Sequence, residues 1–119
     1  MIVLANIVIA VVAILHLGFL ALEMFFWNHP FGRKRFGMTP EYSQASASLA
    51  ANQGLYNGFL AAGLVWALLA PAAYARELAL FFLGCVLVAG LYGGATANRR
   101  IWLLQALPAA LVLAVLFAT

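Results

Sequence analysis

Glu23 is the residue of this sequence whose type and position most clearly suggest chemistry. It lies within the apolar run of residues 20–27, whereas the other two acidic residues, Glu41 and Glu77, stand where the apolar pattern is broken. A carboxyl group inside a membrane span needs a partner, a cavity or a proton, so it predicts a functional site. The structural alternative is that Glu23 reaches the headgroup layer from the last turn of a span.

His16 precedes Glu23 by seven residues. Seven residues are nearly two helical turns, so the two side chains share one face of the first predicted helix. A histidine and a carboxyl group on one stripe are typical of a proton path, an acid–base pair or the polar wall of a ligand pocket. The alternative for His16 is a hydrogen bond that only joins two helices.

A second group of polar side chains lies on the second predicted helix, at Asn52, Gln53, Tyr56 and Asn57. Asn52 and Tyr56 are one turn apart, as are Gln53 and Asn57, so the group covers about a third of the helix circumference. Such side chains cannot comfortably face lipid, and we expect them to face a cavity and orient a ligand. The alternative is hydrogen bonding between helices, at about 0.6 kcal/mol per bond.

The elements that must position these residues are predicted from composition and hydropathy. The chain has 119 residues, of which 67% are hydrophobic and 8% charged, and its mean hydropathy is +1.06. Soluble domains carry roughly 25% charged residues, so the sequence predicts an integral membrane protein. Apolar runs over residues 2–27, 41–70, 76–96 and 101–117 predict four spans in a single transmembrane domain over residues 1–119. Short connections favour an all-α, up-down four-helix bundle.

Polar and proline residues set the predicted helix ends. The first span stops before Pro30. Thr39 is a suitable cap for the second helix, and Pro40 suits its first turn. Pro71 ends that helix, and Pro108 predicts a kink in the fourth.

The basic residues are unevenly distributed between the predicted connections. The second connection holds Arg76 alone, whereas the first and third hold five basic residues. Because positive charge stays on the cytoplasmic side, both termini are predicted to lie outside. The five residues are expected to set this topology and to contact anionic lipid headgroups. They are Arg33, Lys34, Arg35, Arg99 and Arg100.

Several other classes of site are disfavoured. Cys85 is the only cysteine, so an intrachain disulfide and a cysteine metal cluster are excluded. We expect no metal and no cofactor, with a haem or metal bound through His16 as the alternative. The basic residues lie at span ends without aromatic interleaving, which argues against nucleic-acid binding.

Aromatic residues near the span ends, including Trp27 and Trp102, are interpreted as interface anchors. The N-terminal run is too long for a signal peptide and is expected to be retained.

Several motifs resemble a known family. They are EMFxW at residues 23–27, PxGR at 30–33, FG at 36–37 and ANQGxYNGFLAAG at 51–63. Together they resemble the small bacterial four-helix membrane proteins catalogued as domain of unknown function family 1304. The resemblance implies a multi-pass protein of the bacterial inner membrane, and it implies no established activity.

The leading functional hypothesis is binding or transport of a small amphiphilic or cationic molecule, with proton coupling as a variant. Glu23 would be the cation or proton partner, and the other site residues would complete the pocket. Four short helices enclose little volume, so a homo-oligomer surrounded by membrane lipids is expected. One alternative is a membrane-embedded enzyme, of an isomerase or lipid-modifying type, with Glu23 and His16 as acid and base. The other is an accessory subunit of a membrane complex.

Overall fold

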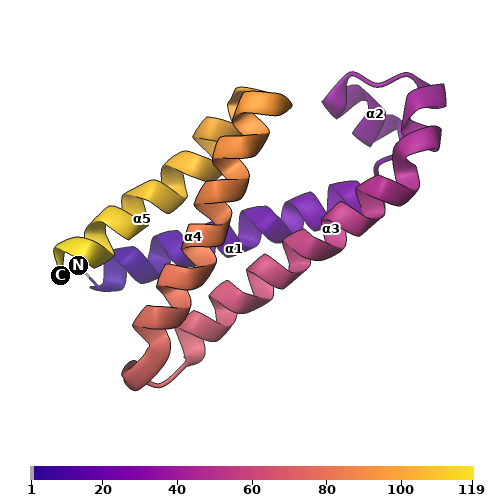
Figure 1. The fold of residues 1–119 in the computed structure, drawn as a ribbon. Helices are drawn as coiled ribbons and strands as arrows, with labels where there is room; N and C mark the ends of the chain where they lie inside the picture. Colours follow the sequence, from indigo (N-terminus) through magenta and orange to yellow (C-terminus); the bar gives the residue numbers. More distant parts are fainter. Residues whose placement is uncertain (1) are drawn as a thin grey trace. The chain divides into compact units, whose positions relative to one another are not determined.

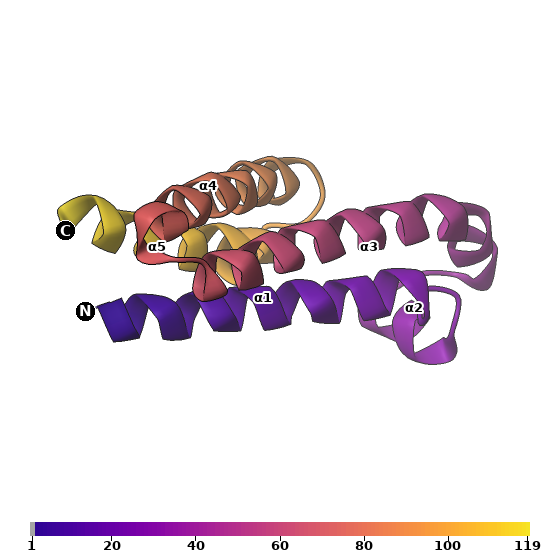
Figure 2. The ribbon, with the colours of Figure 1, turned by 90° about the horizontal axis from the view of Figure 1, so that it is seen from below.

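The computed structural model describes residues 2–119, which form helices joined by short connections, with no strand among them (Figures 1 and 2). This confirms the all-α prediction. The elements are α1 (Ile2–Met24), α2 (Pro30–Phe36), α3 (Pro40–Leu69), α4 (Ala72–Thr96), the π-helical turn η1 (Trp102–Ala106) and α5 (Leu107–Ala118).

The long helices overlap the predicted spans but differ from them at two ends: α4 begins at Ala72, four residues before the predicted bound of 76, and α1 ends before residue 27. The predicted span 2–27 ends as a regular helix at Met24. The backbone N–H groups of Phe25 and Phe26 both donate to the carbonyl of Ala21, at 3.0 and 3.2 Å. This shared acceptor ends the regular hydrogen-bond pattern, and the chain turns away from the helix axis.

The predicted start of α3 is confirmed. Pro40 is its first residue, and the backbone N–H of Tyr42 donates to Thr39 Oγ1 at 3.1 Å. The threonine hydroxyl therefore satisfies one of the N–H groups that a helix leaves unpaired at its first turn.

Helix α2 lies in the segment that the hydropathy pattern assigns to a connection. Its first turn is capped by His29, whose Nδ1 accepts a hydrogen bond from the Phe31 backbone N–H at 3.1 Å. It ends at Phe36, and the capping residue Gly37 has a φ of 64°. The Met38 N–H bonds the carbonyl of Arg33 at 2.8 Å, which completes a glycine-terminated helix end. A seven-residue helix has too few positions to show an apolar period, so hydropathy missed it.

The fourth predicted span is divided in the structure. The predicted kink at Pro108 takes the form of the π-helical turn η1, in which the Leu107 N–H donates to the carbonyl of Trp102. Proline has no N–H, and its ring crowds the carbonyl four residues earlier, so the preceding turn widens.

The described chain forms two compact units, of which the first comprises α1 up to Ala13 together with residues 60–119. Its core consists of small and branched apolar side chains. They are Ala5, Ile9, Val12, Ala13, Leu64, Ala67, Ala79, Leu83, Val86, Ala109 and Val112. Small residues let helix backbones approach closely: a Cβ on Gly90 would lie only 2.7 Å from the backbone nitrogen of Ala106.

The second unit comprises residues 14–59, and it contains all six residues predicted to bind a ligand or proton. Within this unit the last part of α1 runs beside the first part of α3, in the opposite direction, and α2 lies next to their shared end (Figures 1 and 2).

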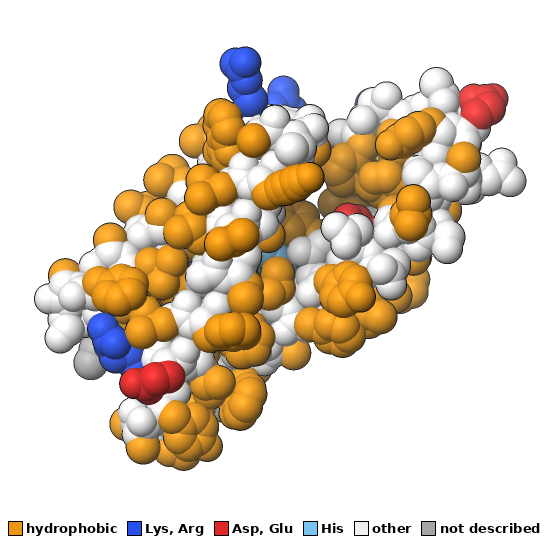
Figure 3. Space-filling model, in the orientation of Figure 1, with side chains coloured by type: hydrophobic (Ala, Val, Ile, Leu, Met, Phe, Trp, Pro, Cys, Tyr) orange, Lys and Arg blue, Asp and Glu red, His pale blue; other side chains and the backbone are white. Residues whose placement is uncertain are grey.

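Two helical segments, Val3–Met24 and Ala72–Thr96, are long and apolar enough to cross a membrane by length and composition. The segment Trp102–Ala118 is apolar but shorter. Many large apolar side chains of these helices point outward, and Figure 3 shows them spread over the visible faces of α4 and α5.

Candidate ligand-binding site

The central contact of the second unit joins Glu23, in the last turns of α1, to Asn57 on α3. The Asn57 side-chain amide donates a hydrogen bond to Glu23 Oε1 at 2.5 Å, and both side chains are partly buried. Within residues 2–119 no lysine or arginine forms an ion pair with this carboxyl group. Its Oε1 atom is therefore held by a neutral donor.

Glycines on α3 bring the two helices close enough for this bond. A Cβ on Gly54 would lie 2.7 Å from Met24 Cγ and 3.1 Å from Glu23 Cβ. A Cβ on Gly58 would lie 2.7 Å from Leu20 Cδ1. The two glycines are one turn apart, so α3 presents a smooth surface to α1 there. Asn57 follows Gly54 by three residues and so lies within reach of the carboxyl group.

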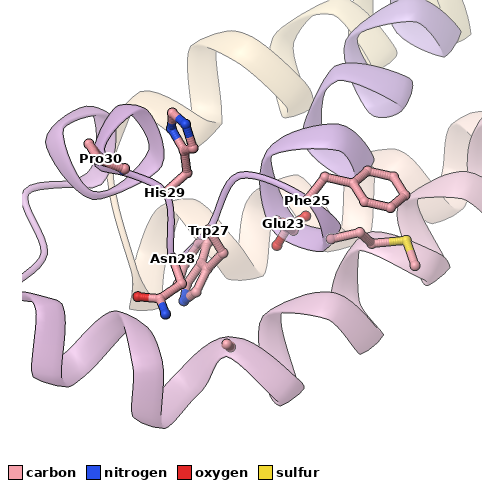
Figure 4. A pocket seen from close by; sticks show the side chains of 8 residues that line it. Glu23, Phe25, Trp27, Asn28, His29 and Pro30 are labelled. Atoms are coloured by element: carbon pink, nitrogen blue, oxygen red, sulfur yellow. The ribbon is translucent and has the colours of Figure 1, made fainter.

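A pocket of about 330 Å³ opens beside Glu23, between the end of α1 and the segment that leads into α2 (Figure 4). Its wall combines a carboxyl, an amide, an imidazole and two aromatic rings with apolar atoms. The lining residues are Glu23, Met24, Phe25, Trp27, Asn28, His29, Pro30 and Ala47.

Trp27 forms part of this wall, and its indole is held by a hydrogen bond and a ring contact. Its Nε1–H donates to Ser46 Oγ at 2.9 Å, and its ring lies 5.1 Å from that of Phe36. The Ser46 hydroxyl in turn donates to the carbonyl of Tyr42 at 2.7 Å. The position of Trp27 near a span end predicts an interface anchor, and the structure places this residue in the pocket wall.

Asn28 also lines the pocket, and hydrogen bonds from two neighbouring residues hold it in place. Arg33 Nη1 donates to the Asn28 carbonyl at 2.7 Å and to its Oδ1 at 3.2 Å. The buried hydroxyl of Ser43 donates to the same Oδ1 at 2.6 Å. Arg33, which the charge pattern groups with the topology and headgroup residues, therefore ties α2 to the connecting segment, and Ser43 ties that segment to α3.

His29 also lines the pocket, although sequence reasoning did not select it. Its Nδ1 accepts the capping hydrogen bond of α2, and its ring makes an edge contact with Phe26 at 5.6 Å. In the neutral imidazole the proton then sits on Nε2, which is the nitrogen that can donate to a ligand. One feature of the sequence could have identified Trp27, Asn28 and His29 as pocket residues. They follow directly after the helix that carries Glu23, within a cluster of polar and aromatic residues.

The structure joins Glu23 to Asn57, but of the six predicted ligand residues Glu23 alone lines the pocket. His16 is fully buried, and its ring makes an edge contact with Phe19 at 5.4 Å. Asn52, Gln53 and Tyr56 are exposed on α3.

The predicted headgroup residues other than Arg33 are exposed, namely Lys34, Arg35, Arg99 and Arg100. Among the described residues there is no group of three or more His, Cys, Asp or Glu side chains that is placed to hold a metal ion.

The fold and the site define a small all-helical protein with apolar outer faces and a pocket built around one carboxyl group. The chain belongs to the family described as Protein of unknown function (DUF1304), whose model matches residues 10–117. This confirms the resemblance seen in the motifs. The chain is 35% identical over 86 residues to the uncharacterized protein YpaA of Lactococcus lactis subsp. lactis (strain IL1403), and the alignment covers 71% of each chain. No solved structure matches the chain.

Proposed function

We propose that the protein spans the bacterial inner membrane four times, with both termini outside. The support is the number of large apolar side chains that face outward: Ile14 is 66% exposed, Phe81 65% and Val88 67%. Exposed large apolar side chains in such number mark membrane or partner contact, and these three lie on the helices that are long enough to cross. Helix α3 has 30 residues and reaches about 45 Å, so it too can cross despite its polar first turns.

The location and topology are tested by fusing reporters to the C-terminus. Alkaline phosphatase folds only outside the inner membrane, whereas green fluorescent protein exported in the unfolded form stays dark there. We expect an active phosphatase fusion and a dark fluorescent fusion, both in the membrane fraction. A bright fluorescent fusion would reverse the proposed orientation, and recovery in the soluble fraction would overturn the membrane assignment.

Within this framework, we propose that the pocket binds a small cationic or amphiphilic molecule. The observation that carries the proposal is the Glu23 carboxyl group, which is held by the Asn57 amide and borders a pocket walled by Phe25 and Trp27. A carboxylate at low dielectric attracts a cation strongly, and aromatic faces add to that attraction. The volume of about 330 Å³ suits a small organic ligand.

The binding proposal is tested with benzyltrimethylammonium, which carries one permanent charge and one aromatic ring. Radiolabelled ligand is equilibrated by dialysis against protein in nanodiscs. The Glu23→Gln variant keeps a hydrogen-bond acceptor for Asn57 and removes the charge, so we expect affinity to fall about tenfold or more. Glu77→Gln is the matched control, since Glu77 is exposed near the start of α4 and should bind as wild type.

Equal binding by wild type and Glu23→Gln would refute a role for the carboxylate. Equal binding of neutral benzyl tert-butyl ether, which has a similar shape, would show that the pocket does not select charge.

Transport and proton coupling are further proposals, tested by ligand uptake into proteoliposomes with and without an imposed pH gradient. The proposed homo-oligomer is tested by light scattering.

The pocket geometry supports binding over the membrane-enzyme alternative. That alternative has Glu23 and His16 act on one substrate, but His16 is not among the residues that line the pocket. A binding role requires only the carboxyl group and the wall that surrounds it.

A further inference from the structure

Helix α2 carries three consecutive basic residues, and the helical turn directs them to different faces. We infer that Lys34 and Arg35, together with Phe31, form a binding site for the headgroup of an anionic phospholipid, while Arg33 has a structural role. This inference rests on the proposed membrane location.

The inward face of α2 is occupied by contacts within the second unit. Gly32 is buried, and a Cβ at this position would collide with the Phe26 carbonyl oxygen. Arg33 donates two hydrogen bonds to Asn28, and the Phe36 ring contacts the Trp27 ring at an interplanar angle of 41°. The Arg33 guanidinium is therefore engaged in the protein.

The outward face presents an apolar ring and two cations. Phe31, Lys34 and Arg35 have the i, i+3 and i+4 spacing that places side chains next to one another on a helix. Phe31 is 59% exposed, and both basic residues are also exposed. Within residues 2–119 neither Lys34 nor Arg35 donates a side-chain hydrogen bond or forms an ion pair.

This arrangement has the chemistry of an interfacial headgroup site. An ammonium and a guanidinium group offer several donors to the two unesterified oxygens of a phosphodiester, and the charges are complementary. An aromatic ring beside them suits the boundary between headgroups and acyl chains. The caps at His29 and Gly37 hold the short helix in place, so the three side chains are presented at a fixed spacing.

The test uses the full-length protein in a neutral detergent and native mass spectrometry. Phosphatidylglycerol and phosphatidylcholine with the same acyl chains are titrated, and the ratio of their apparent affinities is compared between variants. One basic residue at an anionic surface favours binding about fivefold, so Lys34→Gln/Arg35→Gln should lower the preference for phosphatidylglycerol about 30-fold. The charge-conserving Lys34→Arg/Arg35→Lys variant should retain most of it.

Two further variants separate this site from general charge effects. Arg33→Gln should keep the lipid preference and lower the unfolding temperature, because it removes the bonds to Asn28. Arg99→Gln/Arg100→Gln also removes two positive charges, but from another connection. It should reduce the preference for phosphatidylglycerol less than threefold, because only long-range attraction is lost.

The inference is overturned if Lys34→Gln/Arg35→Gln keeps the wild-type lipid ratio, or if the Arg99/Arg100 variant loses as much. Displacement of phosphatidylglycerol by millimolar inorganic phosphate would instead indicate a site for free phosphate. The cell fractionation described above reports separately on the membrane location, so a failure of this site can be distinguished from a failure of the proposed location.

Discussion

Replacement of Gly54 by alanine tests the reasoning that places Glu23 against Asn57. The new methyl carbon would lie 2.7 Å from Met24 Cγ and 3.2 Å from the backbone carbonyl oxygen of Leu20. The Met24 side chain is flexible and can move aside. The Leu20 carbonyl belongs to a helix backbone, so α3 must shift by a few tenths of an ångström instead.

The magnitude follows from two opposing effects. Overpacking of a close contact costs about 1–3 kcal/mol, and alanine gains about 1 kcal/mol over glycine in helix propensity. We therefore expect a net destabilisation of about 1 kcal/mol, which lowers the unfolding temperature by roughly 4 °C. The same shift lengthens the Glu23–Asn57 hydrogen bond, so affinity for benzyltrimethylammonium should also fall.

The assay is thermal unfolding followed by circular dichroism in detergent, with ligand dialysis on the same preparations. Gly84→Ala in α4 is the matched control, because a Cβ on Gly84 meets no atom within 4 Å and should bring only the gain in propensity. If Gly54→Ala proved as stable as Gly84→Ala and bound ligand as wild type, the close approach of α1 and α3 at this point would be refuted.

Three further predictions concern other contacts. Asn57→Ala should weaken benzyltrimethylammonium binding about threefold to tenfold in dialysis, because Glu23 loses its bonded donor; unchanged affinity would contradict this role. Gly90→Ala should lower the unfolding temperature more than Gly54→Ala, because the obstructing atoms include the backbone nitrogen and Cα of Ala106; a smaller loss would contradict the packing of α4 on η1. Arg76→Met removes the 2.8 Å hydrogen bond to a carbonyl near the end of α5, so amide hydrogen exchange should become faster in the last turn of α5 but not in α3.

Local rules predicted most of the secondary structure because they depend on neighbours in the chain. The cap at Thr39 and the first turn at Pro40 needed only the side chains present at those positions. The break at Pro71 and the disturbance before Pro108 follow from the missing proline N–H in the same way. Helix α2 was not predicted, because its cap is the imidazole of His29 and its seven residues are too few for a clear apolar period.

The candidate site was predictable only in part. The sequence shows which residues are polar, but the rotation of each helix about its axis decides which of them face another helix. Six residues were selected by polarity and spacing, and of these the structure joins Glu23 and Asn57. The glycine surface of α3 determines which α3 side chain faces α1, and it favours Asn57 over Asn52 and Gln53. Trp27 entered the pocket wall because Ser46, 19 residues later, accepts its indole N–H.

The sequence by itself determined the helical class, the apolar character, several helix bounds and the choice of Glu23 as a candidate site residue. These properties arise from composition and from interactions within a few residues. The tertiary structure alone decided which donor holds that carboxyl group, which residues wall the pocket, and how the basic run of α2 divides between its two faces. Such pairings depend on the distance between helices and on their rotation, which packing between distant segments sets.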